Sequence, residues 1–270
     1  MQRAVVFPGQ GSGAGEGSGE VWEAVRECVG GAETPYQLSV LAGSVGLFYR
    51  LREAGVGPDV VAGHSLGEYA AAHAAGSLRL EDVVRLVAER DRLMNEAATE
   101  NPGGMVALIG ADPDDVARAV EEVGGVVVAA NFNTPRQTVI SGGKEALDSV
   151  GERVGGRKIR LGVAGAFHSP LMAGASREMG EMLSEVTVEV PRIPIVSAMD
   201  GAVLSTAEGV RSALREQMLS PVRWVAVIER FLSLGVEEIV EAGEDGTLTR
   251  MVRDFRRKEI EGWTAGEVLF

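Results

Sequence analysis

The chain of 270 residues is long enough for one large core, or for a main domain that carries a smaller inserted one. Its 26 basic and 39 acidic residues give a net charge of −13, which argues against nucleic acid as a partner. No apolar run reaches the length of a membrane span, so we expect no membrane partner. The single cysteine, Cys28, excludes an internal disulfide and favours a cytoplasmic location.

The first hundred residues predict alternating strands and helices. In chain order they are a strand over 4–7, a glycine-rich loop over 8–20, a helix over 38–54, a strand over 59–62 and a helix over 68–75. Ser77 is expected to cap a further helix, whose apolar stripe begins at Leu80 and includes Met94. Arg90 lies on this stripe, which is an unusual position for a charged side chain.

A second pattern begins after the break at 101–104, Asn-Pro-Gly-Gly. The predicted elements are a strand over 105–110, a helix over 112–123, strands over 126–131 and 137–142, a helix over 144–154 and a strand over 157–163. This order of strands and helices is that of a ferredoxin-like unit. We therefore predict a ferredoxin-like α+β subdomain over 104–163.

Segments typical of an α/β domain resume after this subdomain. They are a strand within 193–199, helices near 208–218 and 222–234, a strand over 236–243 and a final helix near 247–257. The subdomain is therefore predicted to be an insertion. Residues 1–103 and 164–270 together form the larger domain, which is of the α/β class with a parallel sheet.

The segment Gly63-His64-Ser65-Leu66-Gly67 follows a predicted strand and precedes a helix of small residues. In that context G-x-S-x-G predicts a nucleophile elbow, a sharp turn that exposes the serine hydroxyl. The next amide, that of Leu66, would lie at the helix start, where the helix dipole stabilises an oxyanion. The alternative is a tight turn in which Ser65 only caps the helix.

A serine nucleophile needs a base, and the chain has three histidines. The His64 side chain is expected to point away from its neighbour Ser65, and His73 is about 12 Å further along the helix. His168, in a loop after the last strand of the subdomain, is therefore the candidate base. Taken alone, a loop histidine is more often solvated than catalytic.

Arg90 is a candidate receptor for a substrate carboxylate. A guanidinium on an apolar helix face needs an anion, and its planar fork matches a carboxylate. The alternative is that the side chain reaches solvent or pairs with Glu89 or Asp91. A true α/β-hydrolase fits poorly, because its histidine would lie near the C-terminus and an H-G-G-G-type oxyanion loop would precede the serine.

Six motifs together resemble the malonyl-CoA:acyl-carrier-protein transacylases, and the chain is also similar to polyketide synthase acyltransferase domains. They are FPGQGS at 7–12, GHSLGEY at 63–69, ERDRLM at 89–94, NFNTP at 131–135, AFHSPLM at 166–172 and QMLSPVRW at 217–224. The resemblance covers residues 3–255 in one order. It implies a hydrolase-like α/β core that carries the ferredoxin-like subdomain.

The resemblance also implies a set of roles. Ser65 would be the nucleophile, His168 the base and Arg90 the group that binds the malonyl carboxylate. The remaining roles go to the amides of Gln10 and Leu66 as oxyanion hole, to Gln217 as the group that orients the histidine, and to Asn131, Met94 and Phe167 as pocket residues. Phe167 and the Leu66 side chain would favour malonyl over methylmalonyl groups.

The implied reaction moves a malonyl group from malonyl-CoA to the phosphopantetheine thiol of an acyl carrier protein through a malonyl-serine ester. No metal or further cofactor is expected, and the family suggests a monomer. The basic clusters at 157–160 and 250–258 are the candidate docking patches for the carrier protein. The alternatives are a serine hydrolase or thioesterase, which has no need of Arg90, and a docking subunit without catalysis.

Overall fold

The computed structural model describes residues 2–11, 19–255 and 260–269. A six-stranded sheet forms the centre of the larger domain. Across the sheet its strands are β10 (Glu261–Thr264), β9 (Val236–Glu241), β1 (Gln2–Phe7), β2 (Val60–Gly63), β7 (Ile195–Val196) and β8 (Val203–Leu204). All neighbouring pairs are parallel except the pair of β7 with β8. None of the described helices is long and apolar enough to cross a membrane.

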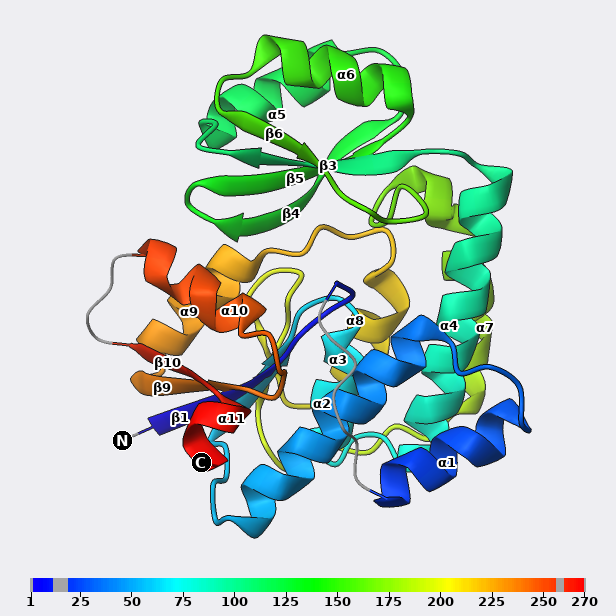
Figure 1. Ribbon diagram of the computed structural model, residues 1–270, viewed down its shortest axis with the longest axis vertical. Helices are drawn as coiled ribbons and strands as arrows, with labels where there is room; N and C mark the ends of the chain where they lie inside the picture. The colour runs from blue at the N-terminus through cyan, green and yellow to red at the C-terminus, as the bar shows by residue number, and fades with distance from the viewer. Residues whose placement is uncertain (1, 12–18, 256–259, 270) are drawn as a thin grey trace.

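Helices cover both faces of this sheet (Figure 1). Successive side chains of β1 point to opposite faces, so that Val5 and Phe7 enter one core and Ala4 and Val6 enter another. The first core is closed by α1 (Gly19–Val29), α2 (Tyr36–Glu53), α3 (Gly67–Ala74), α4 (Leu80–Glu100), α7 (Ala173–Glu185) and α8 (Ala207–Glu216). The second is closed by α9 (Trp224–Ser233) and α10 (Thr247–Val252). The short helix α11 (Ala265–Leu269) packs against α2.

The second sheet lies above the first in Figure 1 and is antiparallel, with strand order β4-β5-β3-β6. Its elements are β3 (Gly104–Ile109), α5 (Pro113–Glu122), β4 (Val127–Thr134), β5 (Gln137–Gly142), α6 (Lys144–Arg153) and β6 (Arg157–Arg160). Helices α5 and α6 bury one face of this sheet, including Leu108 and Ile140. The other face, with Met105 and Val139, looks toward the larger domain.

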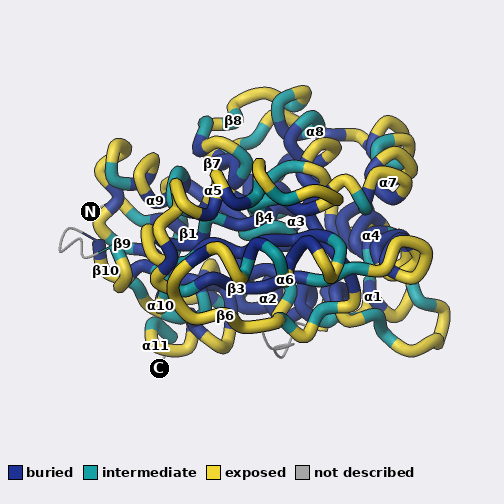
Figure 2. Tube along the Cα trace, turned by 90° about the horizontal axis from the view of Figure 1, so that it is seen from above, coloured by how far each residue is buried: buried dark blue, intermediate teal, exposed yellow. Residues whose placement is uncertain are grey.

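A pair of backbone hydrogen bonds joins the two parts. The Phe132 N–H donates to the Val222 carbonyl at 2.7 Å, and the Val222 N–H donates to the Ala130 carbonyl at 2.8 Å. Strand β4 therefore continues its hydrogen bonding into the loop before α9. Figure 2 shows buried chain (dark blue) running through both parts of the molecule.

The fold class predicted from the sequence is confirmed, and several local expectations are wrong. A helix, α1, begins at Gly19 inside the predicted glycine loop, whose residues 12–18 lie outside the described residues. Ser77 does not cap α4, which begins at Leu80 with Arg79 before it. The last predicted helix stops at Val252, before a 3₁₀ turn over Arg253–Phe255. The elements α7, β8, β10 and α11 were not predicted.

The turn from β2 into α3 lies against β1 without room for a side chain. A Cβ built on Gly67 would lie 2.1 Å from the Phe7 carbonyl oxygen, and one on Gly63 would lie 2.0 Å from the Gly67 carbonyl carbon. Only glycine allows this approach. The two outer glycines of G-x-S-x-G are therefore required by packing.

Gly67→Ala is expected to destabilise the protein by about 3 kcal/mol, because the new methyl group meets rigid backbone. Gly174→Ala is the matched control. A Cβ there meets nothing within 4 Å, and the residue lies in helix α7. The control is expected to leave stability unchanged or to raise it by up to about 1 kcal/mol. Urea unfolding measures both, and equal stabilities for the two variants would contradict the packing argument.

Candidate active site

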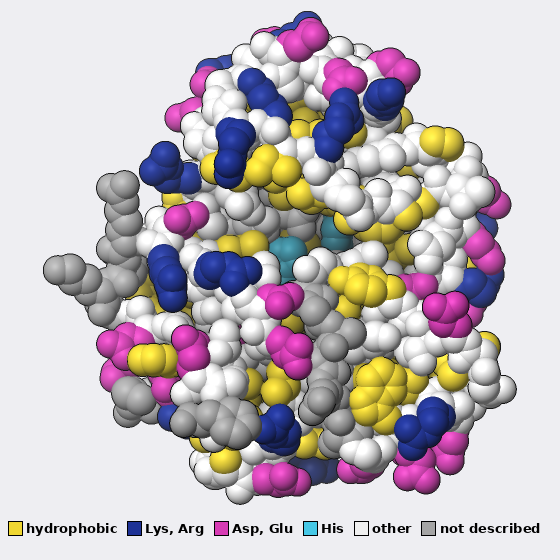
Figure 3. Space-filling model, viewed as in Figure 1, with side chains coloured by type: hydrophobic (Ala, Val, Ile, Leu, Met, Phe, Trp, Pro, Cys, Tyr) yellow, Lys and Arg dark blue, Asp and Glu magenta, His cyan; other side chains and the backbone are white. Residues whose placement is uncertain are grey.

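A pocket of about 350 Å³ lies between the two sheets. The larger domain contributes Ser65, His168 and the loop at Gly9–Gly11, and the inserted subdomain contributes its uncovered sheet face. Figure 3 shows the hollow between the two parts, with histidine side chains (cyan) visible inside it. The wall is mainly apolar, which suits a pocket that shields a reacting group from water.

Ser65 and His168 meet at the floor of this pocket. The Ser65 Oγ lies 2.8 Å from His168 Nε2, close enough for direct proton transfer. Among the described residues they are the only two non-glycine residues with positive φ, 53° for Ser65 and 59° for His168. Such backbone conformations are unfavourable and collect at functional sites.

Two backbone carbonyls fix the His168 ring. The Nδ1–H donates to the Gln217 oxygen at 2.9 Å and to the Ser220 oxygen at 3.0 Å. This places the proton of the neutral ring on Nδ1 and leaves Nε2 to accept from Ser65. The family resemblance implies that Gln217 orients the histidine. Gln217 does contact His168, but through its backbone carbonyl and not through its side chain.

Burial and the positive charge of Arg90 lower the pKa of His168 to about 4, against the opposite effect of the Gln217 carbonyl. The ring is 5% exposed. A lowered pKa keeps the imidazole neutral throughout the physiological range. His168 is therefore available as a base in the resting site.

Arg90 contacts the Ser65 side chain and is 1% exposed. Its Nη2 donates to Ser65 Oγ at 3.0 Å and to the Gln217 side-chain oxygen at 3.2 Å, and its Nη1 donates to the side chain of Gln37. Within the described chain it forms no salt bridge, and its Nε–H has no hydrogen-bond partner. A buried guanidinium in this state has unused capacity to bind an anion. The alternatives of solvent exposure or a pair with Glu89 or Asp91 are not what the structure shows.

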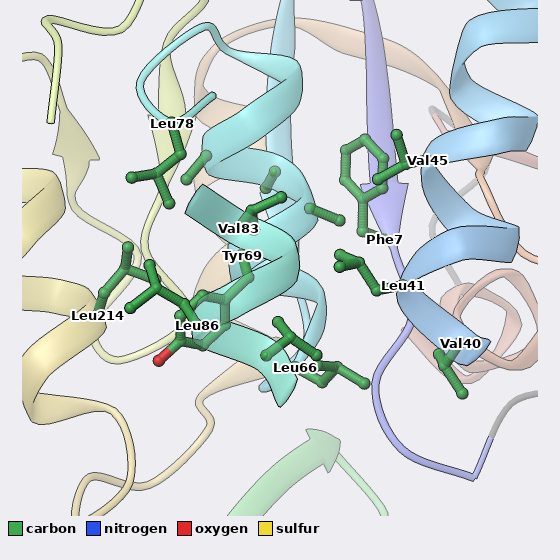
Figure 4. Packing of buried hydrophobic residues seen from close by; sticks show 14 of the residues in the cluster. Phe7, Val40, Leu41, Val45, Leu66, Tyr69, Leu78, Val83, Leu86 and Leu214 are labelled. Carbon is green, nitrogen blue, oxygen red and sulfur yellow. The ribbon is translucent and has the colours of Figure 1, made fainter. Parts of the chain in front are cut away.

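The other predicted residues divide into two groups. Gln10, Met94, Asn131 and Phe167 line the pocket together with Ser65. The Leu66 side chain does not: it is 1% exposed and packs in the core beside Tyr69 and Leu86 (Figure 4). The expectation that this side chain shapes the acyl pocket is therefore wrong, because the elbow turns it inward. The Leu66 amide remains at the start of α3.

Two polar residues near the site, Gln37 and Asn133, were not singled out from the sequence, and His64 was considered there only as a base for Ser65 and set aside. Gln37 holds Arg90 and donates to the Met94 sulfur at 3.6 Å. His64 lines the pocket, and its Nε2 is 2.9 Å from the Asn133 oxygen of the inserted subdomain. No pattern in the sequence marks these contacts, because each joins segments more than 50 positions apart.

The arrangement of Ser65 and His168 on an α/β scaffold is the one expected of enzymes that use a serine nucleophile and a histidine base to form acyl-serine esters. The sequence profile of the acyl transferase domain family matches residues 33–265, and the chain belongs to that family.

Individual relatives agree with this assignment. The malonyl CoA-acyl carrier protein transacylase of Escherichia coli K12 is 37% identical over 225 residues, which are 80% of this chain and 72% of the relative. The crystal structure of the malonyl-CoA:ACP transacylase of Synechocystis sp. PCC 6803 superposes with a TM-score of 0.90 at 28% identity, over 99% of this chain and 98% of that one. A chain in the structure of a type II polyketide synthase acyl carrier protein in complex with its malonyl-transacylase matches with a TM-score of 0.87 at 29% identity, over 98% of this chain and 95% of that one.

The lowered pKa of His168 has a testable consequence for the reactivity of Ser65. Inactivation by an uncharged sulfonyl fluoride requires neutral His168, so its rate is expected to fall only as the pH drops toward about 4. The ordinary histidine value is 6.5. The rate constant of inactivation across pH 3.5–8 measures this, with Ser65→Ala as the unreactive control. A midpoint near pH 6.5 would mean that Arg90 and burial do not act on the base as described.

Proposed function

We propose that this protein transfers a malonyl group from malonyl-CoA to the phosphopantetheine thiol of an acyl carrier protein. The observation that carries the proposal is the contact between Arg90 Nη2 and Ser65 Oγ at 3.0 Å. In a malonyl group one methylene separates the carboxylate from the thioester carbonyl. An acyl carbon bound at Ser65 Oγ therefore keeps its carboxylate within reach of the buried guanidinium.

In the first half-reaction His168 Nε2 takes the Ser65 hydroxyl proton as Oγ attacks the thioester carbonyl. The amides of Gln10 and Leu66 are proposed to hold the oxyanion. When the carbon–sulfur bond breaks, the imidazolium gives its proton to the coenzyme A thiolate. A malonyl ester on Ser65 remains, and His168 is neutral again.

The second half-reaction runs the same steps in reverse order with a different thiol. The carrier's phosphopantetheine thiol gives its proton to His168, and the thiolate attacks the malonyl ester. The carbon–Oγ bond breaks and Ser65 recovers the proton. The mainly apolar pocket between the two parts disfavours water as the competing nucleophile.

The wall of the pocket bears on which acyl group fits. Phe167 is 5% exposed and lines the pocket beside the base, where a branch at C2 of the acyl group would have to fit. Such crowding is expected to raise the transition-state free energy for methylmalonyl transfer by about 1–3 kcal/mol relative to malonyl transfer. Competition between malonyl-CoA and methylmalonyl-CoA measures it, and equal rates would remove Phe167 from this role.

Docking of the carrier is proposed at the basic strand β6, whose residues Arg157–Arg160 are all exposed. Ile159 of this strand also lines the pocket, so a carrier bound there would have its thiol near the mouth. Charge reversal of Arg157 and Lys158 that left transfer kinetics unchanged would remove this surface. The second predicted patch includes residues 256–258, which lie outside the described residues.

We also propose that the protein is a monomer and acts in the cytoplasm.

Arg90→Ala separates malonyl transfer from the serine-hydrolase alternative. Transfer of malonyl to a holo acyl carrier protein is expected to fall about 100-fold or more, because the substrate carboxylate loses its buried partner. Acetyl transfer is expected to change much less. Arg92→Ala is the matched control, because Arg92 lies on the same helix and is exposed, with Glu89 and Glu96 as partners. Malonyl transfer that survives Arg90→Ala would contradict the proposed function.

A further inference from the structure

Glu68 is a buried carboxylate for which the proposed mechanism has no use. It lies in the first turn of α3, three residues after Ser65, and is 5% exposed. An acidic residue in a first helical turn usually faces solvent and interacts with the helix dipole. Here the side chain points into the protein instead, so its carboxylate needs partners.

Both oxygens of Glu68 accept hydrogen bonds. Oε1 accepts from the Ala198 N–H at 3.0 Å, and Oε2 accepts from the Gln217 side-chain amide nitrogen at 2.9 Å. This acceptor pattern is the one that an ionised carboxylate offers. Burial raises the pKa of Glu68 to about 7, while the Ala198 N–H and Arg90 lower it and Asp200 raises it.

The contact with Glu68 decides which way the Gln217 amide faces. A glutamine side chain has one end that donates and one end that accepts. Because its NH₂ group donates to Glu68, its oxygen faces Arg90, whose Nη2 lies 3.2 Å away. The three side chains form a chain of two hydrogen bonds, from the Arg90 donor to the Gln217 oxygen and from the Gln217 NH₂ group to the Glu68 acceptor. We call this chain the relay.

We propose that Glu68 is a positioning residue that sets the acyl specificity: through Gln217 it holds the Arg90 guanidinium in place for the carboxylate of the substrate. This inference rests on the proposed function. Glu68 itself does not contact the substrate. The preference for a malonyl over an acetyl group would nevertheless depend on the Glu68 carboxylate, because Gln217 links it to the Arg90 guanidinium.

Glu68→Gln tests the relay with little change of shape. The new side chain can still accept from the Ala198 N–H with its oxygen, which turns its NH₂ group toward Gln217. The Gln217 amide must then turn over so that its oxygen accepts from the new NH₂ group. Its own NH₂ group then faces the Arg90 Nη2–H, and two donors that face each other cannot form a hydrogen bond. We expect the ratio of kcat/KM for malonyl-CoA over acetyl-CoA to fall about 10- to 100-fold, the range for loss of a hydrogen bond to a charged group.

Two controls accompany this variant. Glu68→Asp keeps two acceptor oxygens and is expected to retain most of the malonyl preference. Glu241→Gln removes another buried carboxylate, which accepts from the Thr249 N–H at 2.9 Å at the end of β9. It is expected to lower stability without changing the preference ratio. Thermal unfolding of all variants shows which of them are folded.

A double-mutant cycle with Arg90→Ala distinguishes positioning from general stabilisation. If Glu68 acts through Arg90, Glu68→Gln changes the preference ratio in the wild-type background and leaves it unchanged in the Arg90→Ala background. If Glu68→Gln does not fold, Gln217→Leu takes its place in the same cycle, because it removes the relay itself. The same pattern is expected.

Equal effects of Glu68→Gln in the two backgrounds, or an unchanged ratio in the wild-type background, would overturn the inference. For the substitute variant, a Gln217→Leu enzyme with the full malonyl preference would do the same. These results leave the proposed function intact. Wild-type enzyme that does not prefer malonyl over acetyl would overturn the proposed function, and the inference with it.

Discussion

At the centre of the site a guanidinium that is 1% exposed is held by neutral oxygens. Arg90 reaches Ser65, Gln37 and the Gln217 side chain, which come from three different segments of the chain. Its charge lowers the pKa of His168, and its contact with Oγ supports negative charge on the nucleophile. No carboxylate of the described residues bonds to it, and the proposed function therefore assigns it the carboxylate of the malonyl group.

The inserted subdomain contacts the segments that hold Ser65 and His168. Its strand β4 bonds to Val222, in the same loop that supplies the Gln217 and Ser220 carbonyls to His168. The side chain of His64, the residue before Ser65, is hydrogen-bonded to Asn133 of the same strand. The subdomain therefore contacts both the loop that orients His168 and the residue before Ser65.

The sequence predicted the residues that a local pattern marks, and it predicted His168 because the chain has only three histidines. Ser65 follows from its strand–turn–helix context, and Arg90 from a charge on an apolar stripe. It did not predict contacts that depend on packing, such as the burial of Glu68 or the inward turn of the Leu66 side chain. Helix α7 was missed because its glycines and small residues carry a weak signal, and packing of Met179 and Leu183 into the core stabilises it.

Intact-mass spectrometry of the enzyme tests the central claim most directly. The enzyme is incubated with malonyl-CoA, freed of excess substrate and then mixed with a holo acyl carrier protein. The account predicts one malonyl group on wild-type enzyme and none on Ser65→Ala, followed by movement of that group to the carrier. Free malonate with an unmodified carrier would contradict it, because the ester would then pass to water.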